Sequence, residues 1–97
     1  MSATDEVELF GFVYTHNTAC ILCTHVAAGE PVALVVHDSD GDISFACARS
    51  AHDDAEFKVI ALGRAASIVD FSQLPHLDEG QQAERTPDGE WRIGTAA

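Results

Sequence analysis

The stretch from residue 31 to residue 47 constrains the fold most, because it has the pattern of a β-hairpin. Residues 31–37 and 43–47 are rich in β-branched and apolar side chains, and Asp40-Gly41 between them is a strong signal for a two-residue turn. With that turn, Val36 would pair with Phe45 and Leu34 with Cys47. Side chains alternate across a strand, so Val32, Leu34, Val36, Ile43, Phe45 and Cys47 would form one apolar face, and Ala33, Val35, His37, Ser44 and Ala46 the other.

Other stretches predict further strands and short helices. Residues 7–15 are apolar on both faces, which indicates one strand in the centre of a sheet, and residues 57–62 indicate another strand. Residues 81–93 resemble a second hairpin that turns at Pro87-Asp88-Gly89, with Trp91 as an anchor in the core. Residues 63–71 have near-helical apolar spacing, and Ser50 has the position of a helix N-cap. Residues 20–26 are compatible with a metal-binding turn, a strand or a short helix.

These elements predict one α+β domain. A chain of 97 residues with a hydrophobic fraction of 46% can bury a modest core. We expect a twisted antiparallel sheet of four to six strands with one or two short helices, formed by residues 7–97. Residues 1–6 are expected to be a mobile tail.

The charge balance restricts the partners. Sixteen acidic residues against five Lys and Arg residues give a net charge of −11, which repels phosphate backbones and disfavours nucleic-acid binding. The same charge suits solubility or a basic protein partner. No apolar run reaches the roughly 18–20 residues that span a bilayer, and residues 1–6 do not resemble a signal peptide. We therefore expect a cytoplasmic protein that contacts neither membrane nor nucleic acid and whose cysteines are reduced.

The spacing of cysteine and histidine predicts a metal site. Cys20 and Cys23 form a Cys-x2-Cys pair, and Cys47 and His52 form a second pair after 23 intervening residues. Two such pairs can supply the four ligands of a structural zinc ion, in the manner of a zinc ribbon. His25 is an alternative ligand to Cys20, whereas the predicted alternation turns His37 away from Cys47. The competing interpretation is that Cys23 and Cys47 are small buried side chains and that His52 lies on the surface.

Two other chemical patterns are weaker. Residues 38–42 resemble the start of a calcium loop, but Ile43 and Arg49 stand where an EF-hand requires glycine and glutamate. A turn is therefore the better interpretation of this acidic stretch. The Cys-x2-Cys pair is also found in thiol redox enzymes, but the residues after Cys23 offer no long helix. A thiol-dependent enzyme is the least favoured hypothesis.

The order of signals after Cys23 resembles a group of small bacterial domains of unknown function, similar to a family of polymorphic-toxin immunity domains. The matching residues are Gly29-Glu30-Pro31, Asp40-Gly41, Asp70-Phe71-Ser72, Gly80, Ala83-Glu84-Arg85 and Gly89-Glu90-Trp91. The chain departs from the pattern at Ile43, where tryptophan is common, and at Phe71, where proline is usual. The resemblance implies a non-enzymatic binding domain and carries over no catalytic residues.

The favoured functional hypothesis is therefore protein interaction, with immunity-like binding of a basic partner through an acidic surface. The carboxylates expected to gather at one end of the domain are Asp38, Asp40, Asp42, Asp53, Asp54 and Glu56. The competing interpretation is that these charges only keep a small domain soluble. The alternative function is that of a small zinc-stabilised structural module.

Overall fold

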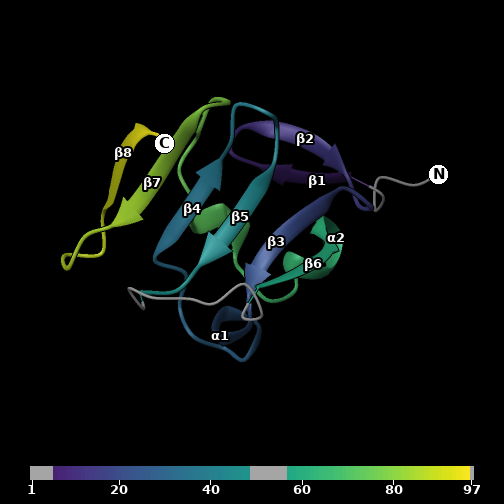
Figure 1. Cartoon of the computed structure of the whole chain (residues 1–97), viewed down its shortest axis with the longest axis horizontal. Coiled ribbons are helices and arrows are strands. Elements are labelled where there is room, and N and C mark those ends of the chain that lie inside the picture. Colours follow the sequence, from purple (N-terminus) through teal and green to yellow (C-terminus); the bar gives the residue numbers. More distant parts are fainter. Residues whose placement is uncertain (1–5, 49–56, 97) are drawn as a thin grey trace.

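The chain forms one domain built on a six-stranded sheet, with a separate two-stranded hairpin (Figure 1). The computed structural model describes residues 6–48 and 57–96. The strand order of the large sheet is β6-β3-β5-β4-β7-β8, and β1 pairs with β2 alone. This architecture confirms the predicted α+β class, the large sheet and the short helices.

The elements within the described residues are all short. The strands are β1 (Glu6–Leu9), β2 (Phe12–Thr15), β3 (Ala19–Cys23), β4 (Leu34–His37), β5 (Ile43–Ala46), β6 (Phe57–Ala61), β7 (Gln81–Arg85) and β8 (Trp91–Thr95). The helices are α1 (Thr24–Ala27), α2 (Leu62–Ala65) and the 3₁₀ helix η3 (Phe71–Gln73). None of these helices has the length or the apolar composition needed to cross a membrane.

The β4–β5 hairpin forms as predicted, but its register differs by one residue. Val35 rather than Val36 pairs with Phe45, and His37 pairs with Ile43. The connection is a three-residue loop, because the Asp38 N–H donates to the Asp42 carbonyl at 2.8 Å. This loop needs a positive φ only at Gly41, which has φ 91°, whereas a two-residue turn would also need one at Asp40. The acidic stretch is therefore a turn, as predicted.

The register change turns β4 over. A shift of one residue moves every side chain of a strand to the opposite face. Val35 and His37, which we had placed on the outer face, are buried with Ile43, Phe45 and Cys47, while Leu34 and Val36 are only half-buried. The predicted inward positions of β5 are correct, and those of β4 are wrong.

Residues 7–15 form a hairpin, so our prediction of a single central strand was wrong. Phe10 and Gly11 have φ values of 61° and 90°, as a tight two-residue turn requires. Glu6, which we had assigned to the tail, already pairs with Thr15. The strained Phe10 is 3% exposed, and its ring lies 5.1 Å from that of His37. Burial of this ring offsets the cost of the unusual backbone.

Residues 20–26 combine two of the three alternatives that the sequence left open. They leave the strand β3 and enter the one-turn helix α1. β3 lies inside the large sheet, antiparallel to β6 and parallel to β5, with Leu22 beside Phe45. This parallel pair was not predicted. It arises because the chain passes through α1 and β4 before β5 returns beside β3 (Figure 1).

The expected helix over residues 63–71 is shorter than its pattern indicated. α2 ends at Ala65, and the Ser67 hydroxyl donates to the Arg64 carbonyl at 2.7 Å, which competes with helix continuation. A new turn, η3, starts after Asp70, whose carboxylate accepts the Ser72 N–H. The apolar spacing is thus met by two separate turns rather than by one helix.

The second hairpin agrees with the prediction. β7 and β8 pair in antiparallel register, and the Thr86 N–H donates to the Glu90 carbonyl across the turn at 2.7 Å. Trp91 packs against the core, and its indole N–H donates to the Gln73 carbonyl at 3.1 Å. Trp91 is therefore the predicted anchor, and it joins the hairpin to η3.

Candidate metal centre

Three potential metal ligands lie together at the carboxyl ends of β3 and β5. The sulfur atoms of Cys23 and Cys47 and a ring nitrogen of His25 all lie within 4.8 Å of one another. Cys23 is the last residue of β3, His25 belongs to α1, and Cys47 directly follows β5. The structure thus groups two ligands of the predicted set with the alternative ligand His25.

The parallel pairing of β3 and β5 creates this group. Because Leu22 lies beside Phe45, the residues that follow both strands leave the same edge of the sheet. The chain then turns sharply into α1, where the Val26 N–H donates to the Cys23 sulfur at 3.4 Å. This hydrogen bond helps to fix the Cys23 sulfur beside the other two ligand atoms.

The geometry and the donor types suit zinc. Zn–S bonds of about 2.3 Å and Zn–N bonds of about 2.0 Å place tetrahedral ligand atoms roughly 3.3–3.8 Å apart. The three ligand atoms would therefore need to approach by no more than about 1.5 Å, which side-chain rotation can supply. Cys23 is 0% exposed and Cys47 is 5% exposed, so a cation between them would offset the cost of burying two thiolates.

Of the other two predicted ligands, Cys20 lies outside the group of three. Cys20 is buried within β3 opposite Ile60 and does not belong to the group of three. Side chains alternate along a strand, so Cys20 and Cys23 project from opposite faces, whereas a metal-binding Cys-x2-Cys pair needs both cysteines on a turn. His52 lies outside the described residues, so its role stays a prediction from the sequence.

Cys20 carries a thiol that is hard to ionise, which predicts a loss of stability in alkali. Burial raises the pKa of the Cys20 thiol from 9.0 to about 11. Between these values the unfolded chain loses a proton that the folded chain keeps, so the free energy of unfolding falls as the pH rises from 9 to 11. Urea unfolding across this range should show a steeper decline for the wild type than for Cys20→Ala. Burial also raises the pKa of Tyr14, which adds the same decline in stability to both proteins. The difference between the two curves therefore reports on Cys20, and parallel curves would contradict the role given to it.

His37 is a buried polar residue whose inward position was not predicted from the sequence. His37 is 2% exposed, with Nδ1 3.0 Å from the Leu77 carbonyl and Nε2 3.1 Å from the Tyr14 hydroxyl. A carbonyl only accepts, so Nδ1 carries the proton, and in the neutral ring Nε2 accepts from Tyr14. Both nitrogens are engaged, which gives His37 a structural role. A predicted hairpin with a three-residue loop between Asp38 and Asp42 would have placed the His37 side chain on the inward face.

No protein-family model matches the chain, and neither does any curated protein or any solved structure.

Proposed function

We propose that the protein is a non-enzymatic binding domain whose fold is stabilised by a zinc ion at Cys23, His25 and Cys47. The observation that carries this proposal is the approach of the three ligand atoms to within 4.8 Å of one another. Cys23 and His25 lie where β3 passes into α1, and Cys47 follows β5, so a shared ion would tie together two segments that are distant in the sequence. Such a link would add directly to the free energy of unfolding.

The surroundings of the ligands favour a structural ion over a catalytic one. Two thiolates and an imidazole are soft ligands that suit zinc rather than magnesium or calcium. None of five surface hollows found over the described part of the chain has Cys23, His25 or Cys47 in its wall. His52, a ligand predicted from the sequence, lies outside the described part of the chain and stays a prediction as a further ligand.

The test is elemental analysis of protein purified without a metal-affinity column. We expect about one zinc ion per chain, a cobalt derivative with the absorption of a tetrahedral thiolate site, and a lower melting temperature after chelation. His52→Ala should weaken zinc binding while retaining the charge-transfer bands of two thiolates. Metal-free protein whose melting temperature is indifferent to zinc and to chelator would overturn the proposal.

The second candidate function is binding of a basic protein partner, as the resemblance to polymorphic-toxin immunity domains implies. One structural observation favours it. The Asp38–Asp42 loop lies against the loop that carries Asp78 and Glu79, because the Gly80 N–H donates to the His37 carbonyl at 2.7 Å. Five carboxylates therefore lie at one end of the described sheet, namely those of Asp38, Asp40, Asp42, Asp78 and Glu79. Asp53, Asp54 and Glu56, which we had expected there, lie outside the described residues.

This second function predicts a salt-sensitive complex with a basic protein encoded beside this chain. Exposed charges are screened beyond about 8 Å at physiological ionic strength, so raising the salt concentration should weaken the complex mainly through slower association. A complex whose affinity does not change with salt would argue against the acidic surface. The thiol-enzyme hypothesis receives no support from Cys20, because burial raises its pKa.

A further inference from the structure

The two cysteines of the candidate metal centre lie close enough to react with each other. The sulfur atoms of Cys23 and Cys47 lie within 4.8 Å of each other, and both residues are free thiols. A disulfide joins its sulfur atoms at about 2.05 Å and has Cα atoms roughly 4.4–6.8 Å apart. The two sulfur atoms would therefore need to approach by no more than about 2.8 Å.

The large sheet places the backbone of this pair suitably. β3 and β5 are parallel with Leu22 beside Phe45, so one residue further along the same register Cys23 lies beside Ala46 and next to Cys47. Neighbouring strands are about 4.8 Å apart and rise about 3.3 Å per residue, which puts the two cysteine Cα atoms about 6 Å apart. This distance lies within the range of a disulfide, so rotation of the side chains can close the bond.

The third cysteine does not take part in this pair. Cys20 lies opposite Ile60 and outside the group of three ligands. Burial raises the pKa of the Cys20 thiol to about 11, so it stays protonated at neutral pH, and the thiolate is the reactive form of cysteine. A bound zinc ion would instead hold Cys23 and Cys47 as thiolates. The chain therefore combines one reactive pair with one inert thiol.

We propose that the zinc centre is a redox switch, in which a peroxide joins Cys23 and Cys47 in a disulfide and the ion is released. The switch rests on the proposed zinc site and adds how that site is regulated. Cys47 is 5% exposed and Cys23 is 0% exposed, so a small oxidant reaches Cys47 first. Hydrogen peroxide is small enough to use such a narrow opening.

The reaction balances with peroxide as the oxidant. The Cys47 thiolate attacks one peroxide oxygen, the O–O bond breaks, and the hydroxide that leaves takes a proton from solvent to become water. The Cys23 thiolate then attacks the sulfur of the resulting sulfenic acid, and the S–S bond forms as a second hydroxide leaves and takes a second proton. The two sulfur atoms supply two electrons and the peroxide accepts them. Zinc keeps its charge and leaves because two of its ligands are lost.

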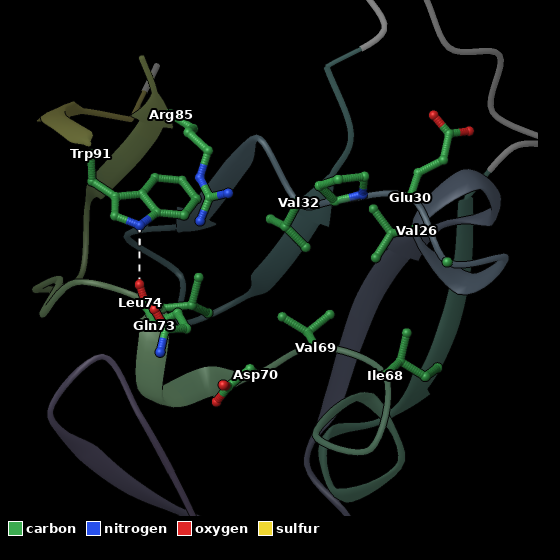
Figure 2. Close-up of a pocket in the computed structure, with 12 residues that line it drawn as sticks. Val26, Glu30, Val32, Ile68, Val69, Asp70, Gln73, Leu74, Arg85 and Trp91 are labelled. Atoms are coloured by element: carbon green, nitrogen blue, oxygen red, sulfur yellow. Dashed lines mark hydrogen bonds between the residues drawn. The ribbon is translucent and has the colours of Figure 1, made fainter. Parts of the chain in front are cut away.

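Oxidation exchanges one link between the strands for another. The disulfide would keep the ends of β3 and β5 joined, whereas His25 would lose the ion that ties α1 to them. Val26 follows His25, and Figure 2 shows its side chain beside a surface hollow, on the side opposite Trp91. The Val26 N–H donates to the Cys23 sulfur at 3.4 Å, and a neutral disulfide sulfur accepts this bond more weakly than a thiolate does. The Val26 amide and methyl NMR signals therefore report on the switch.

The test treats the zinc-loaded full chain with a modest excess of hydrogen peroxide. A chromogenic chelator measures the released zinc, and the intact mass shows whether two hydrogen atoms per chain are lost. We expect about one zinc ion released for each disulfide formed, a shift of the Val26 signals, and recovery of zinc binding after a phosphine reductant. The oxidised protein should also melt at a higher temperature than the reduced metal-free protein, because the new bond closes a loop of the chain.

The Cys20→Ser variant identifies the bond. It contains only Cys23 and Cys47, so a loss of two hydrogen atoms in the monomer can come from a single pairing. Its rate of zinc release should lie within about 2-fold of the wild-type rate, because Cys20 is unreactive. Cys23→Ser and Cys47→Ser should each form no intramolecular disulfide.

The outcomes separate this switch from the zinc site itself. A protein that holds one zinc ion per chain and keeps it in peroxide, or that loses it with irreversible oxidation of sulfur and no disulfide, would overturn the switch and leave the structural zinc site intact. A disulfide that includes Cys20 would also overturn it. A chain that never binds zinc would overturn both, whatever its cysteines do in peroxide.

Discussion

Replacing Cys47 by serine is expected to abolish stoichiometric zinc binding and to cause a large loss of stability. Cys47 would supply one of two thiolates, and the residue is 5% exposed, so a solvent ligand cannot easily take its place. A ligand held at about 1,000 times its dissociation constant stabilises a fold by about 4 kcal/mol, and the variant should lose a contribution of this size. Urea unfolding with and without added zinc measures the difference.

Cys20→Ser is the matched control for this experiment. Cys20 is also buried in the sheet, with 2% of its surface exposed, but it lies outside the group of three ligands. The control should lose stability through the buried hydroxyl yet keep about one zinc ion per chain and keep its response to chelator. Equal loss of zinc in the two variants would contradict the assignment of the site to Cys23, His25 and Cys47.

His37→Ala is expected to destabilise the domain by about 3–4 kcal/mol, the second large effect. The imidazole lies between the rings of Phe10, Phe12 and Tyr14, with centroid distances of 5.1, 5.6 and 6.3 Å. Its removal would leave a cavity under the β1–β2 hairpin and would deprive the buried Leu77 carbonyl of its Nδ1–H donor. Chemical denaturation measures the loss, and faster amide exchange in residues 6–15 would locate it.

Tyr14→Phe separates the hydrogen bond from the packing. This change removes only the hydroxyl that donates to Nε2 of His37, so we expect a loss of about 1–2 kcal/mol and an almost unchanged hairpin. If His37→Ala were as mild as Tyr14→Phe, packing under the hairpin would contribute little. The structural role of His37 would then be wrong.

Local signals predicted most of the elements. The second hairpin, the strand at residues 57–61 and the buried side chains Ile43, Phe45 and Cys47 follow from turn residues and alternating apolar positions. These signals involve residues that are close in the sequence, so the chain does not need to be folded for them to be visible. The hairpin within residues 6–15 escaped because a phenylalanine, Phe10, occupies a turn position that usually takes glycine or asparagine.

The spacing of the cysteines along the sequence predicted part of the candidate site. Cys23 and Cys47 were chosen on spacing, and both belong to the group of three. Cys20 was chosen as well, because spacing alone does not show whether a Cys-x2-Cys pair lies on a turn or in a strand. Pairing of Cys20 with Ile60 places it inside the sheet, and that pairing joins segments 40 residues apart.

The sequence by itself thus determined the class of the fold, the presence of the hairpins around residues 38–42 and 86–90, and the kinds of side chain that could bind a metal. Only the tertiary structure decided the register of β4 against β5, the burial of His37, and the parallel contact that brings Cys23 and Cys47 together. Turn chemistry and alternation act over a few residues, whereas register and strand order follow from the burial of the whole core. One additional residue in the loop between β4 and β5 therefore moved every side chain of β4 to the opposite face, although the local preferences of those residues are unchanged.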